Sequence, residues 1–155
     1  MNNTSDYIEI TQLLNTFGTS IDQREWDTYE TLFADQVDFD YSAIEGPKGV
    51  FTPKKIRGSA EEWLGSFVAT QHVITNHIIN IESNEASCRT HVRAMHLQPN
   101  PQGEALLEIG GHYAGTLVRV ESEWKIKSWK FGIFWSRGNV QLFDLAQQIK
   151  VNFDS

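Results

Sequence analysis

Two histidines occur in stretches of sequence that otherwise have the character of β-strands. His72 lies within residues 70–76, and because side chains four positions apart on a strand share a face, His72 and Asn76 are expected to point the same way. His96 lies within residues 86–98, on the less polar face of an alternating pattern. An imidazole near neutral pH can take up and release a proton, so two histidines directed at one interior suit acid–base chemistry. The alternative is that each ring is a hydrogen-bonded core or interface residue.

The elements that would carry these histidines are predicted by the spacing of apolar residues. A polar turn at residues 82–85 lets the two strands pair as a hairpin. Before them, apolar residues three and four apart predict an amphipathic helix over residues 7–21 and a short helix over residues 26–33. Asp22 lies at the junction of the two helices, where an aspartate can be buried or can simply cap a helix.

Between these helices and the hairpin, the sequence predicts a strand, a connector and a further helix. Residues 37–43 alternate in polarity, with Phe39 and Tyr41 on the apolar face. Residues 45–57 carry two prolines and two glycines and are expected to form an exposed connector, with a mobile flap over a cavity as the alternative. The spacing of serine and glutamate at residues 59–62 is that of a capping box, which predicts a helix that continues to residue 68.

Two long strands, predicted over residues 105–121 and 124–135, dominate the C-terminal half. Tyr113 shares one face of the first strand with glycines and aliphatic residues, an arrangement that could leave room for a ligand. The second strand carries an aromatic stripe that forms either the wall of a ligand site or a packed core or subunit interface, and its members are Trp129, Phe131, Ile133 and Trp135. Apolar residues from 142 to 149 predict a closing helix.

This order of elements predicts an α+β fold in one domain that spans residues 1–155. The long strands would form a curved sheet, mixed or antiparallel, wrapped around the N-terminal helices as a cone with an open mouth. A chain of this length can bury one sizeable core without a second domain.

Composition and charge exclude several classes of function. The net charge of -7 and the lack of a lysine–arginine cluster argue against nucleic acid as a partner. We expect a reduced, cytoplasmic location, because a single cysteine cannot form an internal disulfide and the start of the sequence has no basic or apolar leader region. A membrane-spanning helix is not expected, because no apolar run approaches about 20 residues. The histidines at positions 72, 77, 91, 96 and 112 lack the compact spacing of metal ligands, and no glycine-rich nucleotide loop occurs. Neither a metal nor a cofactor is therefore predicted.

Six motifs spread along the chain resemble those of one protein family. They are residues 21–27 (IDQREWD), 32–35 (LFAD), 37–41 (VDFDY), 70–76 (TQHVITN), 111–113 (GHY) and 124–126 (WKI). In this combination they resemble the SnoaL-like group of the nuclear transport factor 2-like superfamily, which includes scytalone dehydratase and polyketide cyclases. The resemblance covers nearly the whole chain and implies the same cone-shaped fold.

The resemblance also implies roles for four residues. Asp22 looks like the family's buried aspartate and His72 like its catalytic histidine, a pair that forms an acid–base dyad in the dehydratases. Tyr41 and His96 fall where scytalone dehydratase has functional residues.

The chain departs from the family pattern at three places. Ile21 stands where scytalone dehydratase has a tyrosine, and Tyr113 lies near the place of its active-site asparagine. The related dehydrochlorinase and bile-acid dehydratase have an arginine on the last strand, where this chain has Trp129, with Arg137 a few residues further on.

These residues predict a cofactor-independent lyase or isomerase (a dehydratase, isomerase or cyclase) that acts on a small aromatic, polyketide or steroid-like ring compound. His72 would remove a proton next to a carbonyl and return it to a leaving hydroxide, while Asp22 fixes the tautomer of its ring. Tyr41, His96 or Tyr113 would donate to the developing enolate oxygen. The residues expected to bind the substrate are Phe39, Asn76, Tyr113, Trp129, Phe131, Trp135 and Arg137.

Two other functions are compatible with the same fold. One is a non-enzymatic module, for small-molecule binding or protein interaction, in which the dyad is vestigial; the other is an epoxide hydrolase-like enzyme. On the outward faces of the long strands, Leu106, Val118 and Val120 predict a homodimer or homotrimer formed through the sheet.

Overall fold

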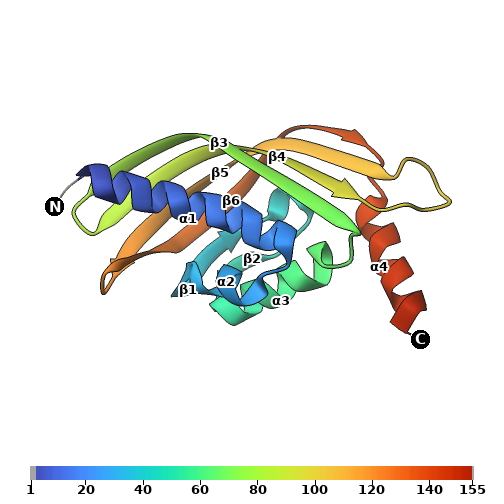
Figure 1. Cartoon of the computed structure of the whole chain (residues 1–155), viewed down its shortest axis with the longest axis horizontal. Helices are drawn as coiled ribbons and strands as arrows, with labels where there is room; N and C mark the ends of the chain where they lie inside the picture. The colour runs from blue at the N-terminus through green and yellow to red at the C-terminus, as the bar shows by residue number, and fades with distance from the viewer. Residues whose placement is uncertain (1–2, 155) are drawn as a thin grey trace.

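A curled, unclosed sheet of six strands wraps around the long N-terminal helix (Figure 1). The computed structural model describes the backbone of residues 3–154 and the side chains of residues 4–149. The helices are α1 (Asn3–Gln23), α2 (Trp26–Thr31), the short 3-10 helix η1 (Ser42–Ile44), α3 (Pro53–Leu64) and α4 (Leu142–Asp154). The strands are β1 (Phe33–Asp40), β2 (Lys48–Phe51), β3 (Ala69–Glu82), β4 (Glu85–Leu97), β5 (Leu106–Val120) and β6 (Glu123–Gly138). The predicted α+β fold with a curved mixed sheet is confirmed.

The strand order in the sheet is β2-β1-β6-β5-β4-β3. Strand β1 pairs in parallel with β6, and every other neighbouring pair is antiparallel. The long strands β3 to β6 follow one another in a meander, so the predicted hairpin of β3 and β4 is confirmed. This curvature gives the sheet an inner face, which packs on the helices, and an outer face.

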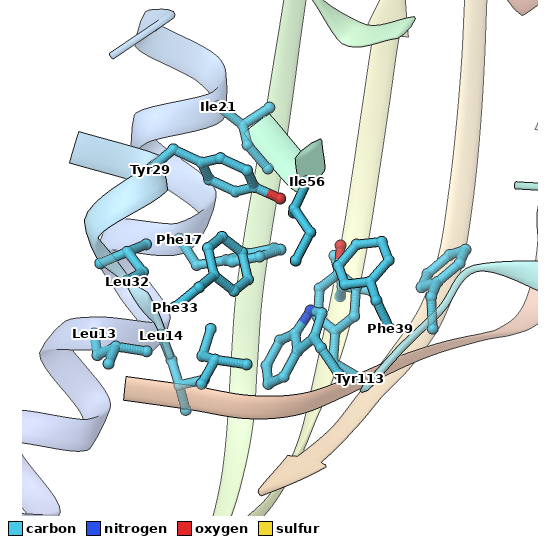
Figure 2. Close-up of a cluster of buried hydrophobic side chains, with 14 of the residues drawn as sticks. Leu13, Leu14, Phe17, Ile21, Tyr29, Leu32, Phe33, Phe39, Ile56 and Tyr113 are labelled. Atoms are coloured by element: carbon cyan, nitrogen blue, oxygen red, sulfur yellow. The ribbon is translucent and has the colours of Figure 1, made fainter. Parts of the chain in front are cut away.

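Helix α1 presents its apolar stripe to the inner face of the sheet. Its residues at three- and four-residue spacing, Ile10, Leu14, Phe17 and Ile21, are at most 2 % exposed, as the periodicity of the sequence predicts. Phe17 lies at the centre of an aromatic cluster, with ring centroids 5.2–5.4 Å from those of Tyr29, Tyr113 and Trp129 (Figure 2). This cluster fixes α1 and α2 against β5 and β6.

The segment of residues 45–57 differs from the exposed connector that its prolines and glycines suggest. Residues 48–51 form β2, which pairs with β1, and α3 already begins at Pro53. Thr52 caps this helix by accepting a hydrogen bond from the Lys55 backbone N–H, and Pro53 supplies the fixed φ of a first helical residue. The capping-box prediction at residues 59–62 was therefore wrong, because the N-cap lies seven residues earlier.

Helix α4 begins beside one end of the curled sheet and extends away from it (Figure 1). Its residue Phe143 packs against Phe67 and His96, with ring centroids 5.1 and 5.0 Å away. The start of α4 thus forms part of the wall of the cavity described below. Over the residues described, the structure holds no helix long and apolar enough to span a bilayer.

Candidate active site

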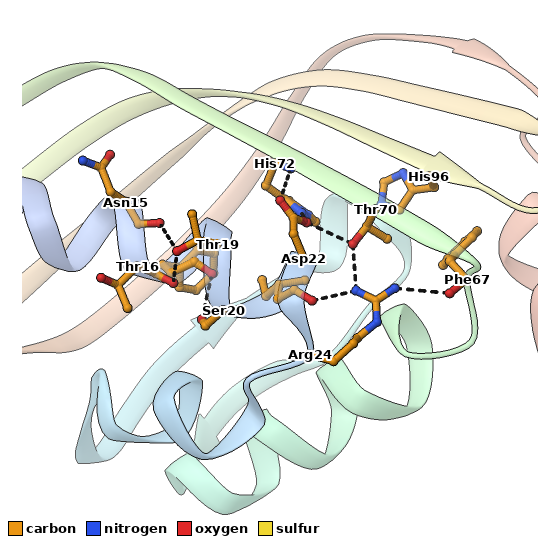
Figure 3. Close-up of polar contacts among 12 residues, drawn as sticks. Asn15, Thr16, Thr19, Ser20, Asp22, Arg24, Phe67, Thr70, His72 and His96 are labelled. Atoms are coloured by element: carbon orange, nitrogen blue, oxygen red, sulfur yellow. Dashed lines mark hydrogen bonds and ion pairs between the residues drawn. The ribbon is translucent and has the colours of Figure 1, made fainter.

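The structure joins Asp22 and His72, fifty positions apart in the sequence, by two hydrogen bonds (Figure 3). The Asp22 Oδ1 atom lies 2.7 Å from His72 Nδ1, and Asp22 Oδ2 accepts a hydrogen bond of 2.7 Å from the His72 backbone N–H. The His72 side chain is 4 % exposed and that of Asp22 is 17 % exposed. The pair is therefore largely withdrawn from bulk water.

Close packing of α1 on β3 brings the two side chains together. At Gly18, an added Cβ atom would lie 3.1 Å from Ile74 Cδ1 and 3.2 Å from the His72 carbonyl oxygen, so a larger residue would push the helix away. Asp22 follows Gly18 by four residues and therefore lies on the same face of α1, directed at the same strand.

Electrostatics keep Asp22 ionised beside the imidazole. Burial raises the pKa of this carboxyl, but the hydrogen bonds and charge of His72, together with a hydrogen bond from Thr70, outweigh burial and lower its pKa overall. A carboxylate can only accept hydrogen bonds, so the His72 Nδ1 atom that faces it carries the proton. In the neutral ring, Nε2 is then the unprotonated nitrogen and can act as a base.

His72 lines an open-mouthed cavity of about 530 Å³ formed by the sheet, the end of α1, α2, η1 with the loop after it, α3 and the start of α4. The polar part of its lining includes His72, His96 and three phenols, those of Tyr29, Tyr41 and Tyr113. Phe39 and Phe131 line it as well, as the sequence led us to expect. The remaining wall is mostly apolar and includes Ile21, Ile56, Trp63, Leu64, Ala94, Leu107, Ile109, Ile133, Val140 and Phe143.

The three phenols are hydrogen-bond donors at any physiological pH. Burial raises the pKa of Tyr29 and of Tyr113 well above its usual range, and burial together with the nearby Tyr113 does the same for Tyr41. Because the protonated phenol persists, each of these groups can donate to a ligand oxygen but cannot serve as a base near pH 7.

His96 is buried, at 2 % exposure, and stays neutral. Burial is the main cause that lowers its pKa to about 3, and the neighbouring His72 adds to the effect. Its Nδ1 atom lies 3.3 Å from the Leu107 carbonyl oxygen, which can only accept, so Nδ1 carries the single ring proton. The other nitrogen, Nε2, is then an acceptor, so neutral His96 cannot donate a hydrogen bond from that atom, contrary to the prediction from the sequence.

Trp129 lies behind the cavity wall instead of on it. Its indole is 1 % exposed and packs between Phe17 and Tyr113, with ring centroids 5.2 and 4.9 Å away. It is not among the residues that line the cavity, so it supports Tyr113 from behind.

Trp135 does not belong to the inner aromatic stripe, and its predicted place in the ligand wall was wrong. Gly111 pairs with Ile133 and Gly110 with Trp135, so Phe134 is an extra residue in β6 and forms a β-bulge. The alternation of side chains shifts by one residue at this point, and the Trp135 indole lies across Gly110 on the outer face, 45 % exposed.

Asn76 and Arg137 also lie outside the cavity, contrary to expectation. A bulge in β3 between Thr75 and Ile78 places Asn76 in the left-handed region, at φ 57°, with its side chain exposed. The Arg137 guanidinium donates to Glu108 Oε2 at 2.8 Å, and its side chain is 74 % exposed. Neither residue can contact a molecule held beside His72.

Sequence reasoning missed two residues next to the pair, Arg24 and Thr70. Thr70 donates a hydrogen bond to Asp22 and accepts one from Arg24. The signal for Thr70 was its place two residues before His72, on the same face of the strand. Tyr29 was missed as a cavity residue because its helical spacing also fits core packing. Within the part of the chain that the structure describes, no group of three or more His, Cys, Asp or Glu residues could hold a metal ion.

Comparisons with known proteins place this geometry in a family. Residues 2–130 match the family model described as a SnoaL-like domain. An uncharacterized protein of Mycobacterium tuberculosis, Rv2910c, is 29 % identical over 127 residues, which cover 79 % of this chain and 81 % of that protein.

Two solved structures have the same fold. The protein Kfla4162 of Kribbella flavida is 25 % identical with a TM-score of 0.87, over 92 % of this chain and 99 % of that one. A candidate scytalone dehydratase of Novosphingobium aromaticivorans is 21 % identical with a TM-score of 0.75, over 88 % of this chain and 89 % of that one. At this level of identity, the second likeness shows the fold alone.

Proposed function

Because this chain belongs to the SnoaL-like domain family, we propose that it is a cofactor-independent lyase or isomerase with His72 as its proton-transfer residue. The observation that carries the proposal is the hydrogen-bonded pair of Asp22 and His72, whose imidazole lines a largely apolar cavity. Family membership makes a lyase-type reaction the natural first choice, and the pair provides a base for it.

The proposed reaction begins with proton removal from a carbon next to a carbonyl group. The Nε2 atom of His72 takes this proton, and Asp22 stabilises the imidazolium that forms. The electron pair of the broken C–H bond moves onto the carbonyl oxygen, which accepts hydrogen bonds from Tyr41 or Tyr113. In a dehydration the enolate then expels hydroxide from the neighbouring carbon, and the imidazolium returns the proton to it as water. In an isomerisation the proton returns to another carbon.

The cavity supports a small, uncharged ring compound as the substrate. Its volume of about 530 Å³ lies in the range of sites for drug-sized ligands. Among the described residues that line it, Glu45 and Asp144 are carboxylates and none is a lysine or arginine, so a substrate carboxylate or phosphate would lack a cationic partner. Aromatic, polyketide and steroid-like ketones carrying a hydroxyl group match these requirements.

The test is proton exchange on a panel of such hydroxyketones in deuterated water. We expect the native protein to exchange the proton next to the carbonyl, or to eliminate water, with at least one of them. His72→Gln should lower that rate roughly 10²–10⁴-fold. His91→Gln is the matched control, because His91 is exposed on β4 and does not line the cavity. An active His72→Gln protein would refute the proposed base, and tight binding without exchange by the native protein would indicate a binding module.

We also propose that the chain forms a homodimer or homotrimer through the outer face of the sheet. Large apolar side chains are exposed there, among them Phe134 at 58 %, Leu106 at 40 % and Val120 at 46 %. Apolar area of this kind is commonly covered by a partner. Light scattering at about 50 μM protein, a concentration at which an ordinary homo-oligomer with sub-micromolar affinity is assembled, tests the proposal, and a monomer mass would refute it.

A further inference from the structure

Arg24 ties together three segments that meet behind the Asp22–His72 pair (Figure 3). It follows α1 in a left-handed conformation, at φ 61°, which turns its side chain back under the helix end. Its guanidinium donates to the carbonyl oxygens of Ile21, at 2.6 Å, and Phe67, at 3.2 Å, and to Thr70 Oγ1 at 2.8 Å. A guanidinium has donors only, so the direction of all three hydrogen bonds is fixed.

The direction of the Thr70 hydroxyl follows from Arg24. Thr70 is 9 % exposed, and its Oγ1 atom lies 2.8 Å from Arg24 and 2.9 Å from Asp22 Oδ1. Because Oγ1 accepts from Arg24, its one proton is available for Asp22. Among the hydrogen bonds of the described residues, those of the Arg24 guanidinium end on Ile21, Phe67 and Thr70, so Arg24 reaches the Asp22 carboxylate through the Thr70 hydroxyl.

The Asp22 carboxylate consequently receives three hydrogen bonds from β3. Oδ1 faces Thr70 Oγ1 and His72 Nδ1, and Oδ2 faces the His72 backbone N–H. The backbone bond fixes one oxygen, and the Thr70 bond fixes the rotation that presents the other oxygen to the ring. Burial of Arg24 lowers its pKa, but the charge of Asp22 opposes this effect, as expected for a cation close to the carboxylate.

We propose that Arg24 and Thr70 are positioning residues that act in series to hold the Asp22 carboxylate ionised and oriented toward His72 Nδ1. This inference rests on the proposed function for its catalytic meaning, but the arrangement of the four residues can be tested without a substrate. Arg24 orients Thr70, Thr70 orients Asp22, and Asp22 holds the proton of His72 on Nδ1, the nitrogen that faces the carboxylate.

The first test is a carbon NMR titration of Asp22 in protein labelled at aspartate side-chain carboxyl carbons. Thr70→Val is nearly isosteric and removes only the hydroxyl, so the proton affinity of Asp22 should rise roughly tenfold or more, the size expected for one hydrogen bond to a charged group. Thr70→Ser keeps the hydroxyl and should restore the native titration. An unchanged titration in Thr70→Val would overturn the proposal.

The control for a merely structural effect is Thr90→Val. Thr90 is 1 % exposed on β4 and donates a 2.6 Å hydrogen bond to the Thr75 carbonyl oxygen, but it does not contact Asp22. The Thr90→Val substitution therefore removes a comparable buried hydroxyl from a neighbouring strand. If Thr90→Val raised the proton affinity of Asp22 as much as Thr70→Val does, general loosening of the sheet would explain both results, and the positioning role would be refuted.

The serial arrangement is tested by the double variant. Arg24→Gln removes the charge and the fork of donors, so it should raise the proton affinity of Asp22, and Arg24→Lys should raise it less. Arg24→Lys keeps the positive charge near Asp22 and removes only the fork of donors, so if that fork acts through Thr70, the double variant Arg24→Lys/Thr70→Val should match Thr70→Val alone. Multiplicative effects would show that Arg24 acts on Asp22 directly and would overturn the serial arrangement.

Activity, once a substrate is found, provides a separate readout. Thr70→Val should lower kcat by about 10- to 100-fold with little change in KM, because Thr70 does not line the cavity. The acid limb of its pH profile should move to higher pH together with the Asp22 titration. If no substrate is found, the proposed function is refuted. The NMR titration still tests the positioning role of Arg24 and Thr70, because it needs no substrate.

Discussion

Asp22→Asn is predicted to reverse the tautomer of His72 without displacing its ring. The substitution is isosteric, but an asparagine has one acceptor oxygen and one donor nitrogen. The oxygen must take the place of Oδ2, because the His72 backbone N–H at 2.7 Å can only donate. The amide nitrogen then faces His72 Nδ1 and donates to it, so the ring proton moves to Nε2.

The size of the effect on activity follows from this reversal. With Nε2 protonated, the neutral ring has no base facing the substrate, and the rate should fall roughly 10²–10⁴-fold, as it does when a general base is lost. The same exchange of aspartate for asparagine in a serine-protease triad leaves the geometry intact and lowers kcat by about 10⁴. Because the residues act as a unit, Asp22→Asn/His72→Ala should be scarcely slower than His72→Ala alone.

The effect on stability is expected to be modest. Thr70, which already accepts a hydrogen bond from Arg24, faces the new amide nitrogen and loses its charged acceptor. A hydrogen bond to a charged group contributes about 1.5–3 kcal/mol, which corresponds to a decrease in Tm of roughly 3–12 °C for a chain of this length. The fold should therefore survive, and the loss of activity should not be a loss of structure.

Long-range ¹H–¹⁵N correlation spectra of protein labelled at histidine nitrogens report the tautomer directly. In the native protein, Nδ1 of His72 should appear as the protonated nitrogen and Nε2 as the unprotonated one, and Asp22→Asn should exchange the two assignments. His96 is the internal control, since the Leu107 carbonyl should hold its proton on Nδ1 in both proteins. An unprotonated Nε2 of His72 in the Asp22→Asn protein would refute the reasoning.

Three further predictions address packing, pH and the cavity. Gly18→Ala should gain about 1 kcal/mol of helix propensity yet not raise Tm, because its Cβ atom would lie 3.1 Å from Ile74 Cδ1; the Nδ1 proton of His72 should also exchange faster with water. The pKa of Asp22 is lower in the folded protein than its unfolded value of 3.8. The ionised Asp22 therefore stabilises the fold above the unfolded pKa, and this contribution is lost as pH falls through the lower folded pKa. The difference in unfolding free energy between the native protein and Asp22→Asn, measured in urea, should therefore shrink from about pH 5 to about pH 3 and not on the alkaline side. Phe131→Leu should weaken binding of a ring compound and Trp135→Leu should not, since only Phe131 lines the cavity; equal losses in calorimetry would contradict the placement of β6.

The candidate site was predictable from sequence only in part. The alternation of polar and apolar residues in β4 correctly places Val92, Ala94 and His96 on the buried face. Recognition of the motifs suggested the pairing of Asp22 with His72, and the two are found in hydrogen-bond contact. The same alternation failed at Asn76 and Trp135, because each lies at or beyond a β-bulge that adds one residue to a strand and moves the following side chains to the other face.

The sequence by itself determined the elements and their buried faces, because helical and strand periodicities are local properties of the chain. It also determined the chemical types available at the site, a carboxylate, two imidazoles and several phenols. Only the tertiary structure decided which of these groups meet. Contact between Arg24, Thr70 and Asp22 depends on how closely α1 lies on β3. The nitrogen that carries the proton in each histidine depends on an acceptor from another segment. This acceptor is Asp22 for His72 and the Leu107 carbonyl oxygen for His96. Local periodicity contains no information about such partners, since they are set by strand register and helix packing across the whole fold.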